Sequence, residues 1–282
     1  MTSGEDFLAR MSRASEIRAR RLGARVDGSD LRRQAMNMSP PPTLRLSPEG
    51  FDLIAEIKLS SPSAGTLSRD TSAIEQRATV YAEAGACAVS VLTEPDRFGG
   101  SMDHLQRAAR ALEPAGVPAM AKDFLVAPEQ VWAARVAGAS GILLIIRMLD
   151  QTRLSALLEL ALELGMFVLL EAFDRDDLER AAGLRVADDD NAGPVLLGLN
   201  CRNLRTLQVD PGRFGELAEQ KSESILLFVD QAEELYTLID DSETRVAFLT
   251  ALASAADDPL GPVRVILTMR EDFLGRMARI SG

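Results

Sequence analysis

Six polar or ionisable residues stand where short apolar runs of the sequence end, and their types suit acid–base chemistry. They are Glu56, Lys58, Lys122, Glu171, Asn200 and Arg202. A lysine ammonium can protonate or polarise a carbonyl group, and a nearby carboxylate shifts the pKa values of both partners towards such roles. The chain has a single histidine, His104, which disfavours a Ser-His-Asp triad and a histidine-based zinc site. Proton transfer therefore falls to Lys, Glu and Asp.

Two structural interpretations compete with a catalytic one. A charged residue at the end of a strand is often the solvated start of a loop, and a Glu and a Lys inside a barrel can form a structural ion pair. Four separate runs nevertheless place an ionisable or amide group at the same level. Because burying such groups costs free energy unless they pair, this agreement favours a shared site.

The elements that must position these groups form eight short β-prone runs, separated by stretches of mostly helical apolar spacing. The runs are Leu53–Ile57, Ala88–Leu92, Ala119–Ala121, Ile142–Ile146, Phe167–Leu170, Val195–Leu199, Ile225–Val229 and Val263–Leu267. Helical segments that end on Gly85, Gly138 and Gly165 precede three of them. Eight such units predict a closed parallel (βα)8 barrel, with the active site at the carboxyl ends of its strands.

We expect one α/β domain over residues 1–282, a (βα)8 TIM barrel with an extra N-terminal helix. Residues 1–50 form a helical extension, with a basic amphipathic helix at Phe7–Arg33 and a loop at Ser39–Pro42. Residues 51–222 supply the first six βα units, and residues 223–282 supply two atypical ones. An open doubly wound sheet is less favoured because no G-x-G-x-x-G follows the first strand.

The composition places the chain in the cytoplasm and excludes some partners. Hydrophobic residues make up 46% of the chain, yet no apolar run is long enough for a membrane span, and we see no secretory signal. A net charge of −11 argues against nucleic acid as a partner, while a small phosphorylated substrate needs only a local cluster of donors. Cys87 and Cys201 fit reduced residues in or near the core.

Five motifs in the same order resemble those of the indole-3-glycerol phosphate synthase family. They are the Glu-x-Lys and Ser-Pro-Ser of Ile54–Ser63, Val91–Glu94 with Phe98–Ser101, Ala121–Phe124, Leu170–Ala172 and Gly198–Leu204. The resemblance runs from about Phe7 to Glu219. It implies a carbon–carbon lyase of tryptophan biosynthesis that closes 1-(2-carboxyphenylamino)-1-deoxyribulose 5-phosphate to an indole ring, with loss of CO2 and water. It implies neither a metal ion nor an organic cofactor.

The resemblance also implies roles for the residues at the barrel mouth. Lys122 would be the general acid of ring closure, and Glu171 would act in the later proton abstraction and dehydration. Glu56 and Lys58 would hold and tune the site, and Lys58 could also donate a proton or contact an anion.

Three further residues would bind the substrate. Asn200 and Arg202 would orient its hydroxyl groups and carboxylate, and Ser61 would lie near it in the first loop.

The last two units depart from the family pattern. The family carries Gly- and Ser-containing loops after strands seven and eight to bind the substrate phosphate, whereas Asp230–Glu234 and Thr268–Glu271 contain no glycine. Arg270 could replace a phosphate ligand. Residues 223–282 also carry 11 acidic and 5 basic residues, which disfavours a phosphate there.

This tail resembles instead a Walker-B segment of STAND-type NTPases, at Leu226–Leu235. An ATPase is disfavoured because the chain has no G-x-x-x-x-G-K-[ST] loop. We therefore hypothesise a fusion in which this segment, with a helix at Asp240–Ala256, completes the barrel. The alternative function is a catalytically impaired barrel that acts as a fusion or scaffold protein. Phosphoribosylanthranilate isomerase is a weaker alternative, since it lacks the Glu-x-Lys and Lys-Asp-Phe motifs.

Overall fold

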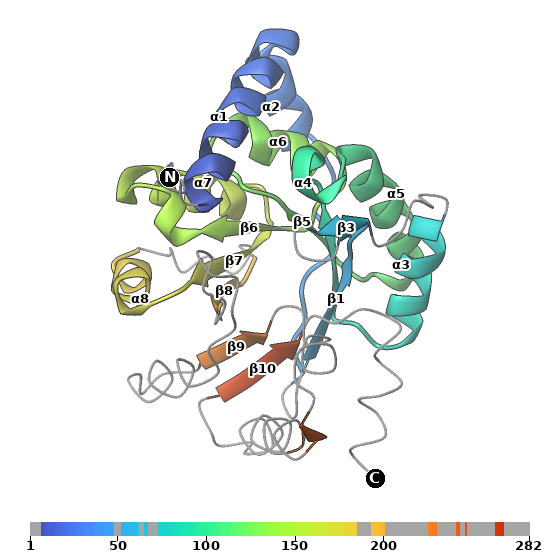
Figure 1. Cartoon of the computed structure of the whole chain (residues 1–282). Helices are drawn as coiled ribbons and strands as arrows, with labels where there is room; N and C mark the ends of the chain where they lie inside the picture. The colour runs from blue at the N-terminus through green and yellow to red at the C-terminus, as the bar shows by residue number, and fades with distance from the viewer. Residues whose placement is uncertain are drawn as a thin grey trace.

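Eight parallel strands surround a common interior in the order in which they occur along the chain (Figure 1). The computed structural model describes residues 7–47, 52–61, 65–66, 73–184, 193–200, 225–229, 241–242, 246 and 263–267. The strands are β1 (Asp52–Ile57), β4 (Ala88–Leu92), β5 (Ala119–Lys122), β6 (Gly141–Ile145), β7 (Phe167–Ala172), β8 (Val195–Leu199), β9 (Ile225–Val229) and β10 (Val263–Leu267). Their hydrogen-bonded order is β8-β7-β6-β5-β4-β1-β10-β9, and β8 lies beside β9. This is the arrangement of a (βα)8 barrel, as the sequence predicts.

Helices follow the strands and cover the outside of the sheet. They are α3 (Ile74–Glu83), the short α4 (Pro95–Phe98), α5 (Met102–Leu112), α6 (Pro128–Val136), α7 (Gln151–Glu163) and α8 (Arg175–Ala182), with 3-10 turns η2 (Glu113–Ala115) and η3 (Ile146–Met148). The predicted glycines end α3, α6 and α7, since Gly85, Gly138 and Gly165 have φ angles of 87°, 95° and 70°. A positive φ suits a residue without a Cβ atom, which explains glycine at these three ends.

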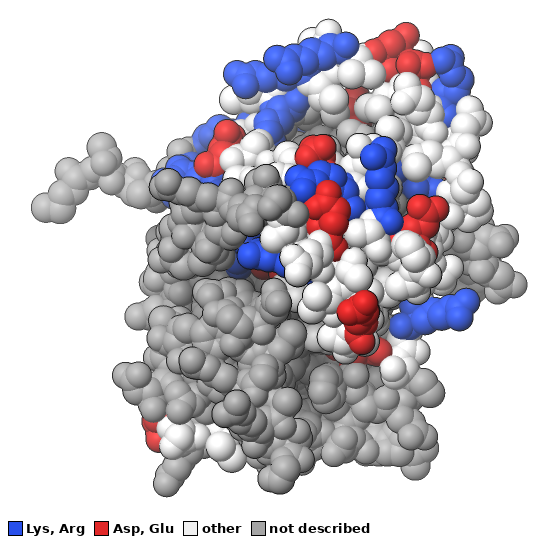
Figure 2. Space-filling view, turned by 90° about the vertical axis from the view of Figure 1, so that its right-hand side faces the viewer, with Lys and Arg blue, Asp and Glu red and all other residues white. Residues whose placement is uncertain are grey.

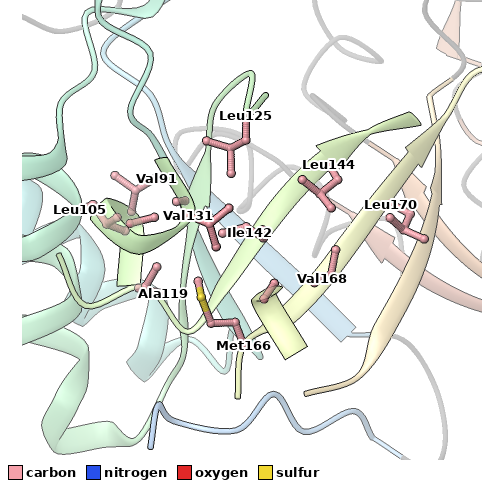
Figure 3. Packing of buried hydrophobic residues seen from close by; sticks show 14 of the residues in the cluster. Val91, Leu105, Ala119, Leu125, Val131, Ile142, Leu144, Met166, Val168 and Leu170 are labelled. Carbon is pink, nitrogen blue, oxygen red and sulfur yellow. The ribbon is translucent and has the colours of Figure 1, made fainter. Parts of the chain in front are cut away.

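Strands β4, β5, β6 and β7 are buried along their whole length and so on both faces, which explains why their apolar runs do not alternate strictly with polar residues. One set of side chains, including Val91, Ile142 and Val168, packs outward against Leu105 of α5 and Val131 of α6 (Figure 3). The other set points into the barrel and forms a separate cluster. It includes Ile54, Ala88, Met120, Leu143, Phe167, Leu169 and Leu196.

The N-terminal extension contains two helices, so the single helix predicted at Phe7–Arg33 is wrong. The first, α1, spans Phe7–Arg25, and the second, α2, spans Gly28–Met36. Asp27 lies between the two helices in an extended conformation. Its side chain accepts a hydrogen bond from the Ser29 amide and so caps the start of α2. An Asp that caps a new helix stabilises a break that the amphipathic pattern alone does not reveal.

One face of α1 packs on the barrel, and its other faces are basic. Leu8, Met11, Ser15 and Ala19 are buried at helical spacing, and Leu8 and Met11 join the interior cluster. Six arginines lie on this helix, and blue side chains are prominent at the α1–α2 end of the molecule (Figure 2). No helix among the described residues is both long and apolar enough to cross a membrane.

Two parts of the predicted organisation differ in detail or are not described. A small antiparallel hairpin that the sequence did not predict, β2 (Ser60–Ser61) with β3 (Gly65–Thr66), follows β1. The helix predicted at Asp240–Ala256 and the segments after β9 and β10 fall almost wholly outside the described residues.

Candidate active site

Strand alternation carries three of the predicted residues into the barrel. Glu56, Lys122 and Glu171 each stand two positions after an interior residue, namely Ile54, Met120 and Leu169. Because side chains two apart share a face of a strand, all three point inward. Each also stands in the last two residues of its strand, so the three groups meet at the carboxyl-terminal end of the barrel, as predicted.

Glu56 lies between two lysines. Its Oε1 atom is 3.0 Å from Nζ of Lys58, and its Oε2 atom accepts a hydrogen bond of 2.6 Å from Nζ of Lys122. The three residues are 7–8% exposed. The carboxylate therefore holds both ammonium groups in place, with both of its oxygens occupied. The alternative that these charged residues are merely the solvated start of a loop is wrong, because all three are buried and paired.

Glu171 and Asn200 form a second pair at the same end. Nδ2 of Asn200 donates a hydrogen bond of 3.1 Å to Oε1 of Glu171, which is 4% exposed. The backbone amide of Asn200 donates to the carbonyl of Ala172 at 2.8 Å, which fixes the residue directly after β8. The carboxylate of Glu171 is therefore buried and held at the same end of the barrel as Glu56 and Lys122.

A charged network that the sequence did not reveal supports the loops beside Lys122. Arg18 of α1 donates to Glu94, at 3.0 Å, and to Asp123, at 2.5 Å. Glu94 also accepts hydrogen bonds from the amides of residues 96–98 and so caps α4. Thr93 donates to Asp123 at 3.2 Å. The network joins the N-terminal helix to the loops after β4 and β5, and Asp123 adjoins Lys122 in the chain.

Within this network the guanidinium of Arg18 compensates the negative charges of two carboxylates. Burial raises the pKa of the Asp123 carboxyl, and the charge of Arg18 acts in the opposite direction. Arg18 is 18% exposed, whereas Glu94 and Asp123 are 0% and 4% exposed at their side chains. Two buried carboxylates thus share one cation. Thr93, Glu94 and Asp123 lie in the family motifs Val91–Glu94 and Ala121–Phe124, but nothing in the sequence pairs them with Arg18.

Several predicted residues fall outside the described part of the chain. The side chain of Ser61 does, although its backbone lies in β2, and so do Arg202, Cys201 and the loops after β9 and β10. Cys87 is a free thiol, and burial raises its pKa to about 12. It is therefore an unreactive packing residue, in agreement with the sequence.

Comparison with known proteins identifies one family. The family model described as indole-3-glycerol phosphate synthase matches residues 9–232. The synthase of Parafrankia sp. is 44% identical over 62% of this chain and 60% of its own length. The indole-3-glycerol phosphate synthase 1 of Streptomyces coelicolor is 37% identical over 70% of each chain. The family match includes β9, so the resemblance to NTPases is not supported.

Solved structures are similar in fold alone. Dihydropteroate synthase of Xanthomonas albilineans, with 4-aminobenzoic acid, superposes with a TM-score of 0.53 at 16% identity, over 86% of this chain and 96% of that one.

The region of sequence similarity spans 60%, 66% and 58% of the lengths of the Parafrankia, Micrococcus luteus and Beutenbergia cavernae synthases. Because the family model covers well over half of the residues, this chain belongs to the indole-3-glycerol phosphate synthase family.

Proposed function

We propose that the protein is an indole-3-glycerol phosphate synthase, a cytoplasmic carboxy-lyase of tryptophan biosynthesis. Its substrate would be 1-(2-carboxyphenylamino)-1-deoxyribulose 5-phosphate, a small phosphorylated molecule. The observation that carries the proposal is Glu56 held between Lys58 and Lys122, at the same barrel end as Glu171 and Asn200. This arrangement offers ammonium donors and a separate carboxylate, which are the groups that the reaction needs.

Ring closure requires a proton donor beside a ketone. The ring carbon that bears the carboxylate attacks the ketone carbon, a carbon–carbon bond forms, and the carbonyl electron pair moves to oxygen. Lys122 supplies a proton to that oxygen, and Glu56 holds the ammonium in position. The bond to the carboxylate then breaks, CO2 leaves, and its electron pair restores the aromatic ring. Lys58, on the other oxygen of Glu56, is the alternative donor.

Dehydration completes the indole ring. The hydroxyl formed from the ketone leaves as water, and a proton leaves the neighbouring CH2 carbon as the new double bond forms. Glu171 is placed in our proposal as the base for that proton. Its hydrogen bond to Asn200 keeps one carboxylate oxygen oriented. Asn200, Arg202 and Ser61 are proposed to bind the substrate hydroxyls and carboxylate.

Turnover of the named substrate tests the proposal directly. Indole glycerol phosphate is fluorescent, so its formation by the purified chain gives kcat and KM, with circular dichroism as the measure of folding. Turnover with a micromolar KM is expected. A folded protein with a millimolar or unmeasurable KM would instead favour the impaired-barrel alternative, for which neither the contacts described above nor the relatives give support.

A further inference from the structure

Two lysines pair with the carboxylate of Glu56, but Arg18 holds the chain beside only one of them. The ion-pair partners of Arg18 among the described residues are Glu94, Asp96 and Asp123. The first two follow β4, and Asp123 directly follows Lys122, the last residue of β5. Lys58 follows β1, and none of these three carboxylates lies on that strand or next to it in the chain. The two lysines are therefore supported differently.

The main chain at Lys122 is fixed on both sides by this network. The Thr93 amide donates a hydrogen bond of 3.1 Å to the carbonyl oxygen of Lys122. The Asp123 carboxylate accepts from the Thr93 hydroxyl at 3.2 Å and from the Phe124 amide at 2.7 Å. Arg18 completes this set of contacts, at 2.5 Å from the same carboxylate. The side chain of Lys122 thus starts from a main chain that is held in place.

A second set of contacts from α1 reaches the same loop without using a charge. The Ser15 hydroxyl donates to the carbonyl oxygen of Phe124, and the Gln130 amide group donates to the Ser15 oxygen at 2.9 Å. The Gln130 oxygen in turn accepts from the Val126 amide at 2.9 Å. These bonds do not depend on Arg18. Replacement of Arg18 is therefore expected to loosen the ion-paired part of the loop while α1 stays docked.

Loss of Arg18 would leave two buried carboxylates without their cation. The side chains of Glu94 and Asp123 are 0% and 4% exposed. Buried charges that have lost their partner disturb the structure around them, because they gain free energy by reaching water. Asp123 is bonded to Lys122 in the chain, so its displacement moves the base of that lysine. Lys58 has no such connection to the two carboxylates.

We propose that Arg18 is a positioning residue, which sets the place of Lys122 in the active site through Asp123. The inference rests on the proposed function, in which Lys122 donates a proton to the substrate ketone. A donor must be held close to the reacting atom, and a displacement of about 1 Å can lower turnover by about a hundredfold. Arg18 therefore acts on kcat more than on KM, and on Lys122 more than on Lys58.

Chemical labelling compares the two lysines within one molecule. Formaldehyde with cyanoborohydride methylates amines, and mass spectrometry of peptides gives separate rates for Lys58 and Lys122. The two start alike, since each is 8% exposed and pairs with Glu56. In Arg18→Met we expect the rate at Lys122 to rise at least about tenfold more than the rate at Lys58, because local opening exposes one strand end. In the synthase assay, kcat is expected to fall by about ten- to a hundredfold, with a much smaller change in KM.

Leu112→Ala is the matched control for a general loss of stability. Leu112 is wholly buried, at the end of α5 that leads back to the start of β5. Its truncation leaves a cavity between helix and sheet and lowers Tm. We expect it to raise the labelling rates of Lys58 and Lys122 by the same factor and to leave kcat of the folded enzyme close to that of the wild type.

Asp123→Asn decides if Arg18→Met does not fold. It removes one of the two carboxylates, and Arg18 keeps its ion pair with Glu94. The amide oxygen of asparagine can still accept a hydrogen bond, so a smaller loss of kcat is expected. The rise in labelling should again be selective for Lys122.

Three outcomes would overturn the proposal. They are equal changes in labelling at Lys58 and Lys122, a wild-type kcat in a folded Arg18→Met, and a raised KM with unchanged kcat. If the wild type does not turn over the named substrate, the proposed function fails instead. The labelling ratio, which needs no turnover, then still tests whether Arg18 positions Lys122.

Discussion

Replacing Lys122 by alanine separates a catalytic role from a structural one. After this change Glu56 keeps Lys58 at 3.0 Å, so the buried carboxylate retains a counter-charge. The loss of one charged hydrogen bond costs about 1.5–3 kcal/mol, which lowers Tm by roughly 3–12 °C in a domain of this size. Loss of the proton donor is expected to lower kcat at least about a hundredfold, or ~2.7 kcal/mol in the activation barrier. Fluorescence of indole glycerol phosphate measures kcat, and circular dichroism measures melting.

Lys58→Ala is the matched control, because it removes the other ammonium from the same carboxylate. It should lower Tm by a similar amount and keep more of the turnover if Lys122 donates the first proton. The reverse order of kcat values would assign that proton to Lys58. If Lys122→Ala is folded and both variants turn over at close to the wild-type rate, Glu56 and its lysines form a structural ion pair, and the mechanism proposed here is refuted.

Three other changes have definite expected results. Glu171→Gln should lower kcat at least about a hundredfold with little change in melting, and near-normal kcat would remove Glu171 from the mechanism. Arg18→Met should destabilise the fold by about 3–5 kcal/mol at pH 7.5 and by less at pH 4.5. Burial raises the pKa of Asp123, so its protonated form adds stability below the unfolded pKa, and this is lost as pH rises through the folded pKa, where ionised Asp123 needs Arg18. An equal loss of Tm at both pH values would contradict this reasoning. Gly141→Ala would place a Cβ atom 2.3 Å from the ring of Phe167 and should cost about 1–3 kcal/mol in urea unfolding, so unchanged stability would show that the ring can move away.

Most of the barrel could be predicted because its strands are short, apolar and separated by helices that end on glycine. Four of the eight strands, such as Ala88–Leu92 and Val195–Leu199, have the predicted bounds. The break in the first helix was missed because Asp27 forms its cap through a local hydrogen bond, which competes with a continuous amphipathic pattern. The Walker-B resemblance of the seventh strand was misleading, since a buried parallel strand followed by an aspartate occurs in unrelated folds.

The centre of the site could also be predicted, whereas its support could not. The carboxyl ends of parallel strands share one edge, so alternation within each strand was enough to bring Glu56, Lys122 and Glu171 together. Arg18 reaches its partners through the tertiary position of a helix, and no spacing rule in the sequence encodes that distance. The structure places Glu56, Lys58, Lys122, Glu171 and Asn200, but the roles of these residues stay predictions, as do those of Ser61 and Arg202.

The ion pairs that Arg18 forms with Glu94 and Asp123 bear on the order in which the chain can fold. Arg18 is joined to Glu94 across 76 residues and to Asp123 across 105 residues. During synthesis α1 therefore leaves the ribosome long before either carboxylate exists, and it cannot dock until α6 and η3, the elements that it contacts, have been made. Contacts so distant in sequence slow folding because a long loop must close first. We expect α1 to dock late, after the first half of the barrel has assembled. Its docking then completes the network that supports the loops after β4 and β5.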